Sequence, residues 1–236
     1  MTWAERLSIF SAADLAALGL LAVLWLWIDW RIENHGAKRV SVSVLMEGFR
    51  REWMRVMLAR NPRILDSQML GILRQGTAFF ASAAMIAIGG GLALIGNTEQ
   101  LAGVAADLTA ARVPAIVWEV KIIVILLFLA NSFLKYVWAH RLFGYCAVLM
   151  AAVPNEVDDP MAVTRAEQTA ALSNTAARSF NKGMRSTYFA LASVAWLLGP
   201  LALALAAVTT AGLLWRRELG SQSRAILLKS PPSTRV

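Results

Sequence analysis

Apolar residues in this chain gather into four long runs, and the stretches between the runs mix apolar with charged residues. The longest run predicts one continuous helix over 113–154, whose first part, 113–134, is apolar enough to cross a bilayer. At about 1.5 Å per residue the whole helix would measure roughly 60 Å, about twice the thickness of a hydrocarbon core. We therefore expect its second part, 135–153, to lie outside the membrane.

Three other runs have the composition of membrane spans, at about 10–28, 76–95 and 187–215. Gly199 and Pro200 interrupt the last run, and a proline inside a helix removes a backbone hydrogen bond and bends the helix. We therefore predict a kinked fourth span. In the second run, small residues at every fourth position would let helices approach closely, within one chain or between two copies: Ala83, Ala87 and Gly91.

The connections between the spans predict further helices outside the bilayer, at about 40–74, 135–153 and 160–182. The first of these has an apolar face of residues four positions apart: Leu45, Phe49, Trp53 and Met57. Such a face fits a helix lying on the inner leaflet, or one packed on the outer part of the longest helix. The polar, Pro-containing tail, 216–236, is expected to be flexible.

Together these patterns predict an all-α polytopic membrane protein, a single membrane domain with four transmembrane helices and long cytoplasmic helical extensions. Composition agrees, because 58% of the 236 residues are hydrophobic, only 16% are charged, and the mean hydropathy is +0.55. The single Cys146 excludes a disulfide within the chain. A net charge of +8 in such a chain favours contact with anionic lipid head groups, and not nucleic acid.

The distribution of Lys and Arg predicts an orientation. Fifteen of these residues lie in the two long connections, against seven in the tail, before the first span and in the short connection. By the positive-inside rule both long connections are cytoplasmic and both termini lie outside. The predicted location is the cell membrane, which is the inner membrane in a bacterium.

Three ionisable residues fall within the predicted spans, near their outer ends: Asp14, Glu119 and Lys121. A charge at that depth costs a few kcal/mol unless it faces a partner or water. Asp14 with Lys121 is the simplest pair, and Glu119 is the competitor of Asp14. The pair is either a structural ion pair or part of a transport or proton site.

A second cluster of candidate site residues is expected at the cytoplasmic end: Arg51, Arg74, His140, Arg141, Arg185 and Tyr188. Arginines beside planar aromatic rings suit recognition of phosphate or carboxylate, although they also reach lipid phosphates from the ends of spans. No catalytic, nucleotide-binding or metal-binding motif is recognisable, so we expect no cofactor and no metal, and we lean against an enzyme.

Three runs resemble, in order and spacing, the domain-of-unknown-function family 599: FRREWMRVMLARNPRILDSQMLGILRQGTAFFASAAMIAIGGGLALIG, FLKYVWAHRLFGYCAVLMAAVP and FNKGMRSTYFALASVAWLLGP. The resemblance covers roughly 15–219. It implies a small polytopic membrane protein of the kind found in bacteria and plants, and it implies no activity, substrate or catalytic residue.

Three classes of function follow from the sequence. The first is a structural or accessory subunit of a membrane assembly, which acts in a homo-oligomer or a larger complex. The second is a small oligomeric transporter or channel, which a water-accessible cavity reaching Asp14 and Lys121 would favour. The third is a membrane protein that binds, or acts on, an anionic ligand, nucleotide or lipid at its cytoplasmic arginine-rich face, which a deep cytoplasmic pocket would favour.

Overall fold

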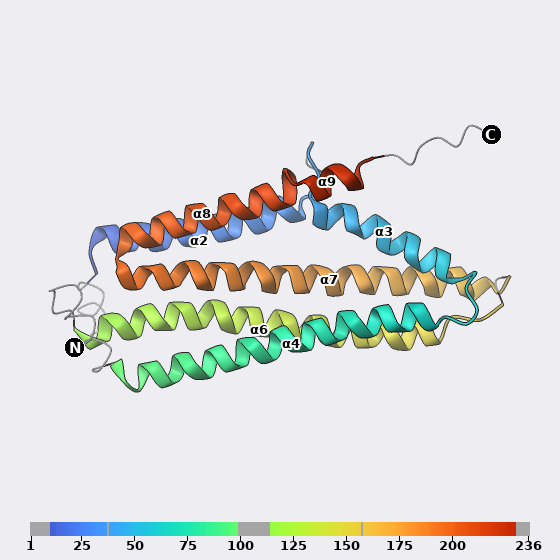
Figure 1. The fold of residues 1–236 in the computed structure, drawn as a ribbon, viewed down its shortest axis with the longest axis horizontal. Coiled ribbons are helices and arrows are strands. Elements are labelled where there is room, and N and C mark those ends of the chain that lie inside the picture. Colours follow the sequence, from blue (N-terminus) through green and yellow to red (C-terminus); the bar gives the residue numbers. More distant parts are fainter. Residues whose placement is uncertain (1–9, 37, 99–113, 157, 230–236) are drawn as a thin grey trace.

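A computed structural model describes residues 10–36, 38–98, 114–156 and 158–229. The described residues form helices that lie roughly along one long axis (Figure 1), and they contain no strand, which confirms the all-α prediction. The helices are α2 (Ala12–Glu33), α3 (Val42–Met57), α4 (Ile64–Ile95), α6 (Ala115–Ala151), α7 (Pro160–Val194), the 3-10 helix η1 (Ala195–Leu198), α8 (Pro200–Leu219) and α9 (Gln222–Leu227).

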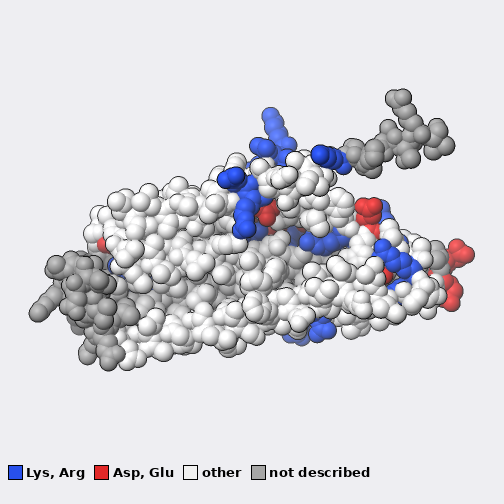
Figure 2. Space-filling model, viewed as in Figure 1, with Lys and Arg blue, Asp and Glu red and all other residues white. Residues whose placement is uncertain are grey.

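Three of these helices, α2, α4 and α6, are long and apolar enough to cross a membrane. On the face seen in Figure 2 one half of the molecule is almost free of charge, while the other half carries nearly all the Lys, Arg, Asp and Glu. The apolar half contains α2, residues 76–95 of α4, residues 115–134 of α6, the end of α7, and α8; the charged half contains α3 and the remaining parts of α4, α6 and α7.

The predicted long helix is confirmed by α6, whose 37 residues would measure about 55 Å. By contrast, α4 corrects the boundary predicted between a cytoplasmic helix, 40–74, and a span, 76–95. One helix of 32 residues begins at Ile64 and continues through Gly76 without a break. An isolated glycine lowers helix propensity by only about 1 kcal/mol, and the packing of α4 along α6 outweighs that cost.

The predicted fourth span, 187–215, is not one kinked helix. Helix α7 continues from Pro160 to Val194, and the chain then reverses so that α8 runs back beside α2 (Figure 1). The reversal takes place at Gly199, whose φ of 124° is readily adopted only by glycine, and Pro200 then starts a new helix at its first position. As a result α8 ends where the charged half begins, not at the end of the molecule where α2 starts.

Gly183 does not interrupt α7, although separate helices were predicted over 160–182 and 187–215. Its missing side chain makes room for the ring of Tyr136 on α6, since a Cβ at position 183 would lie 2.7 Å from Tyr136 Cε1. Gly91 serves α4 in the same way, because a Cβ there would lie 2.5 Å from a methyl group of Leu126. Gly91 therefore lets two helices of the same chain approach closely, which was one of the two alternatives for the small residues of the second apolar run.

Two hydrophobic cores lie in series along the molecule. In the charged half, Met54 and Met57 of α3 pack with Leu70 of α4, Phe143 of α6 and alanines of α7. The buried face of α3 therefore differs from the predicted one. Met57 is buried and Trp53 packs against this core, but Phe49 is exposed. The α3 helix packs mainly against α7, and not along the outer part of the longest helix, α6, as one of the two alternatives had it.

The core of the apolar half joins α2 to the hairpin of α7 and α8. Its largest fully buried side chains are Leu21, Ile28, Phe189, Trp196 and Leu203. The tail expected at 216–236 is ordered over its first part, since α8 continues to Leu219 and α9 follows, with Arg224 Nε donating to Val40 O at 2.8 Å. Residues 230–236 lie outside the described part of the chain.

Candidate functional site

A network of ion pairs lies at the junction of the two halves. Helix α7 carries Arg178, Lys182 and Arg185 at steps of four and three residues, which places them on one helical face. They meet Asp29 and Glu33, which lie four residues apart on α2. Arg185 is only 3% exposed, and it donates from Nε to Asp29 Oδ1 at 2.7 Å and from Nη2 to Glu33 Oε1 at 2.6 Å.

The other two cations extend this network to α3. Lys182 Nζ lies 3.4 Å from Asp29 Oδ2, and Arg178 Nε lies 3.1 Å from Glu33 Oε2. Arg178 also donates from Nη2 to Glu47 Oε1 at 2.8 Å. Three cations therefore face three carboxylates, so the group is balanced in charge and holds α2, α3 and α7 together.

Glu47 lies at the edge of this network with a second partner. Burial alone raises the pKa of its carboxyl, but the hydrogen bonds from Arg178 and from His35, whose Nε2 lies 3.1 Å from Glu47 Oε2, outweigh burial and hold the pKa below its ordinary value. The backbone carbonyl of Glu47 also accepts from Asn174 Nδ2 at 3.3 Å. Glu47 therefore stays ionised and ties α3 to α7.

Helix α8 joins the network through Glu218. Ser43 donates from its backbone N and from Oγ to the two carboxylate oxygens of Glu218, both at 3.0 Å. Asn181 of α7 donates to the same Ser43 Oγ at 3.2 Å. All four helices that meet at the junction, α2, α3, α7 and α8, are thus connected by polar side chains.

The six residues predicted for a cytoplasmic binding site do not come together. Arg185 is neutralised within the ion network, and Tyr188 accepts from Arg217 Nη1 of α8 at 2.9 Å. Arg141 donates from Nε to Tyr145 Oη at 2.6 Å on the outside of α6, while His140 Nδ1 lies 3.3 Å from the carbonyl oxygen of Arg74.

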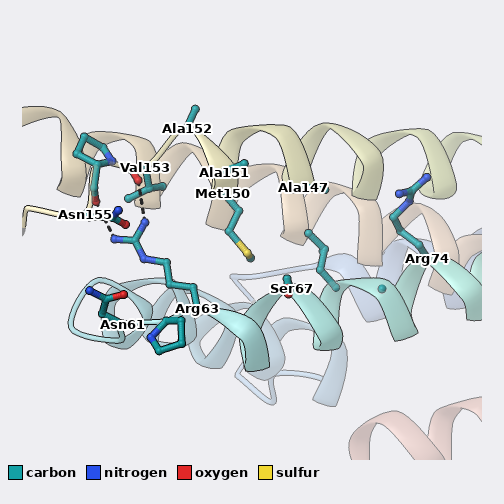
Figure 3. Close-up of a pocket in the computed structure, with 14 residues that line it drawn as sticks. Asn61, Arg63, Ser67, Arg74, Ala147, Met150, Ala151, Ala152, Val153 and Asn155 are labelled. Atoms are coloured by element: carbon teal, nitrogen blue, oxygen red, sulfur yellow. Dashed lines mark hydrogen bonds between the residues drawn. The ribbon is translucent and has the colours of Figure 1, made fainter.

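Arg74 borders a cavity of about 640 Å³ between the start of α4 and the end of α6 (Figure 3). At its other end Arg63 donates from Nη1 to Val153 O and from Nη2 to Pro154 O, each at 2.7 Å. These carbonyls follow the last turn of α6, which leaves such groups without helical partners. Arg63 therefore fixes the connection between α6 and α7.

Arg51 borders a polar groove of about 430 Å³ between α3 and α7, over a floor of small alanines. Two more arginines line the groove, but so do Glu47 and Glu167. Arg55 Nη2 lies 3.6 Å from Glu167 Oε1, so part of this positive charge is already compensated. The groove is mixed in charge, unlike a pocket built for a multiply charged anion.

The charged residues of the apolar half converge on Trp196. Asp14 completes a capping box with Ser11 at the start of α2 and accepts from Trp196 Nε1 at 2.8 Å. Lys121 Nζ lies 5.7 Å from the centre of the Trp196 ring and 5.4 Å from that of Trp118. Within the described part of the chain no ion pair within 4.0 Å joins Asp14 to Lys121, and Glu119 instead accepts from Thr98 Oγ1 at 3.3 Å.

A comparison with known families agrees with the resemblance noted from the sequence. The family described as "Protein of unknown function, DUF599" matches residues 16–223. The chain belongs to this family. No similar curated protein and no similar solved structure was found.

The match to DUF599 covers every helix of the junction network, yet sequence reasoning missed most of that network. The available signal was spacing: the cations at 178, 182 and 185 and the carboxylates at 29 and 33 each follow one helical face. Asp29 and Glu33 lie just after the predicted first span, 10–28. Among the described residues no group of three or more His, Cys, Asp or Glu is placed to hold a metal ion.

Proposed function

We propose that this DUF599 protein is a structural or accessory subunit of a membrane assembly. The observation that carries this proposal is an uncovered apolar face on the part of α4 that lies in the charged half. Leu65, Met69 and Ile72 are each more than two fifths exposed there, with no charged residue between them on that face. Apolar faces of this kind on a protein surface mark sites of interaction.

This face lies outside any bilayer that covers the apolar half. Residues 63–70, at the start of α4, lie level with residues 147–154, at the end of α6, because Arg63 contacts the carbonyls of Val153 and Pro154 and a shared cavity lies between Leu70 and Ala147. Ala147 is twelve residues beyond Lys135, or roughly 18 Å along the helix. Lipid therefore does not cover Leu65 and Met69, and burying such a side chain contributes about 1.5–3 kcal/mol.

In this proposal the apolar half crosses the bilayer five times, with the end of α7 and α8 as the last two crossings. The hairpin moves the five basic residues of the tail to the side of the long connections. That side then carries 20 of the 23 Lys and Arg residues. The other three are Lys121 and two residues that precede α2 and α6 in the sequence, Arg6 and Arg112. The positive-inside rule thus favours an outside N-terminus and a cytoplasmic C-terminus.

The junction network favours a rigid scaffold over a moving carrier. Charges paired around the buried Arg185 hold α2 and α7 in one arrangement, and the pair of Arg178 with Glu47 adds α3, since separating the helices would leave ions without partners. Asp14 and Lys121 support the same interpretation, because Asp14 accepts from Trp196 Nε1 and Lys121 Nζ lies 5.7 Å from the centre of the same ring, as structural contacts would.

Labelling of single cysteines in native membranes tests whether a partner covers the α4 face. Ile72→Cys should react at least fivefold more slowly with a membrane-impermeant maleimide in membranes than in the purified, detergent-separated protein. Val163→Cys is the matched control, because it is similarly exposed and lies in the charged half, at the start of α7. Equal rates for Ile72→Cys in both preparations would mean that no partner covers this face.

Recognition of anionic lipid is a second candidate, favoured by arginines held against aromatic rings at the junction. The Arg31 guanidinium lies 5.3 Å from the centre of the Trp215 ring, which stacks on Trp27, and Arg217 contacts Tyr188. In nanodiscs, anionic lipid should raise the Tm of the native protein relative to zwitterionic lipid. Arg31→Gln with Arg217→Gln should remove most of that difference, and an unchanged difference would argue against the arginines as the lipid contacts.

A further inference from the structure

We propose that the partner of α4 is a second copy of this chain, so that two α4 helices pair side by side along their length. This inference rests on the proposed function, since it names the partner that covers the uncovered face. The face is one stripe, which we call the α4 stripe: it runs from Leu65 to Gly90 in alternating steps of four and three residues. That spacing is the repeat by which two helices pack knobs into holes.

The stripe is distinct from the face that α4 uses within its own chain. Leu70, Thr77 and Ala84 are buried, at the level where α4 packs along α6. The large residues of the stripe are instead exposed to an increasing degree: Ile72 by 61%, Phe79 by 67% and Ile86 by 75%. The two faces lie roughly a third of a turn apart, so one helix can serve both contacts at once.

The stripe continues from the charged half into the apolar half, and this continuity restricts what can cover it. Lipid covers Phe79 and Ile86 but does not reach Leu65, whereas a soluble partner covers Leu65 but does not enter the bilayer. A partner that covers all three is a helix that leaves the membrane without a break. Helix α4 itself is such a helix, and a second copy presents it at the same depth.

The order of residues along the stripe suits pairing with an identical helix. A two-fold axis along the membrane normal places each residue beside its own copy. Small residues recur every seven positions, at Gly76, Ala83 and Gly90. They alternate with large residues, at Ile72, Phe79 and Ile86. Layers of small residues let the two backbones approach, and the large residues fill the layers between them.

The charges of α4 also fit self-pairing, which brings like charges together wherever a charged residue lies in the contact. The helix has only two, Asp66 and Arg74, and both lie off the stripe. Asp66 is fully buried, where it contacts Arg60 and accepts from Trp53 Nε1 at 2.7 Å. Gln68 and Gln75 flank the stripe, and an amide both donates and accepts, so it can bond to its own copy.

Beside the stripe the apolar half has room for a partner's side chains. Phe79 and Ala83 line a cavity of about 390 Å³ between α4, α6 and α7, and Gly90 lines a second one of about 370 Å³ further along. Both cavities are lined almost entirely by apolar residues. The gap between α4 and α7 is thus left open by this chain at the point where the large side chains of a second copy would enter.

Disulfide cross-linking in native membranes tests the pairing directly. The chain has one cysteine, Cys146, and it is buried, so an added cysteine is the reactive one. Ile72→Cys and Ile86→Cys should form covalent dimers at least fivefold more efficiently than Met85→Cys, which is exposed on a different face of the same turn. Equal cross-linking at all three positions would indicate random collision and would overturn the proposal.

The same variants separate failure of the pairing from failure of the proposed function. If Ile72→Cys forms no dimer but stays protected from the maleimide, another protein covers the stripe; the accessory role stands and the second copy is excluded. If Ile72→Cys forms no dimer and reacts as fast as Val163→Cys, both proposals are wrong.

Glycine substitutions give a second test that does not depend on cysteine chemistry. A Cβ at Gly76 or at Gly71 meets nothing within 4 Å in the monomer, so a side chain starts without a clash at either position. Gly76 lies on the stripe and Gly71 does not. In mild detergent Gly76→Leu should raise the Kd of the dimer at least tenfold, and Gly71→Leu should change it less than twofold. A native protein that is monomeric at every concentration measured would contradict the pairing.

Discussion

The guanidinium of Arg185 shows how a single residue can be essential for the fold without being a ligand site. It is the link between α2 and α7 at the junction, and both of its bonded partners, Asp29 and Glu33, are carboxylates of the same chain. An arginine three residues before Tyr188 suggested an anion site, but the anions that Arg185 meets are carboxylates of its own chain. Its contribution is therefore best measured as stability.

Removing Arg185 should destabilise the protein strongly. Arg185→Leu leaves Asp29 and Glu33 without their buried partner, and breaking such a pair costs about 3–5 kcal/mol. Lys182→Leu is the control, because its side chain is 35% exposed and exposed pairs contribute about 0–1 kcal/mol. Thermal unfolding in detergent should show the difference, and similar losses for both variants would mean that burial does not decide the role of Arg185.

Glu47 predicts a dependence of stability on pH. Its pKa in the folded state lies below the ordinary value of 4.5 because of Arg178 and His35, despite the opposing effect of burial. A carboxyl with a depressed pKa contributes stability that is complete above its unfolded pKa and is lost as the pH falls toward the folded pKa. The Tm should therefore decrease as the pH is lowered below about 4.5, and it should decrease less steeply in Glu47→Gln. Identical pH profiles for the two proteins would rule out this contribution.

Cys146 offers a probe of the core in the charged half. Its thiol is fully buried among Phe143, Met150 and the alanines of α7, and Sγ lies 3.8 Å from the carbonyl oxygen of Thr169. A maleimide should therefore label it only as fast as this core opens, at least a hundredfold more slowly than the denatured chain. Labelling of the folded protein at the denatured rate would show that this core is open.

At the scale of the elements, prediction from sequence succeeded where a local signal decides the outcome. Asp159 accepts from the backbone N of Met161 at 2.7 Å and Pro160 follows, so the predicted start of α7 is confirmed. The continuous α6 also followed from its sequence, because nothing in 115–151 breaks a helix. These features depend on residues within one or two turns of each other.

Prediction failed where contacts between residues far apart in the sequence determine the structure. A Gly-Pro pair in an apolar run can bend a helix or end it. Here the chain turns back, because Leu203 and Ala207 of α8 are buried in one core with Ala17 and Leu21 of α2. The same limit applied to the candidate site. Arg178 and Arg185 were visible as basic residues, but their partners lie more than 130 positions earlier, on helices whose positions the sequence alone does not fix.

Gly183 gives the sharpest test of how α6 and α7 pack. Gly183→Ala places a methyl group against the ring of Tyr136 at a distance that forces one helix to move, and overpacking of this kind costs about 1–3 kcal/mol. Gly144→Ala is the matched control on α6, since a Cβ there meets nothing within 4 Å and alanine favours a helix by about 1 kcal/mol. The Tm should decrease in Gly183→Ala and increase in Gly144→Ala. An unchanged Tm in Gly183→Ala would contradict the close contact.

At the scale of the whole molecule, two cores in series are joined by one polar junction. The apolar half has the surface of a membrane domain and the charged half that of a helical bundle in water, and α4, α6 and α7 run through both. Because three helices are continuous across the junction, a displacement at one end is transmitted to the other as a rigid movement. A partner bound to the α4 stripe would therefore contact the molecule in both media at once.

The orientation of the C-terminus tests this arrangement as a whole. The hairpin of α7 and α8 gives an odd number of crossings in our proposal, so reporters fused before α2 and after Lys229 should lie on opposite sides of the membrane. A single kinked helix over 187–215 would place both on the same side. The fusion after Lys229 should report the cytoplasm, where the Lys and Arg residues gather. A third fusion, at Gly36 between α2 and α3, serves as the reference because it follows the first crossing in either arrangement. If the fusions at Gly36 and after Lys229 report different sides, α8 does not cross the bilayer, and the five-crossing arrangement must be abandoned.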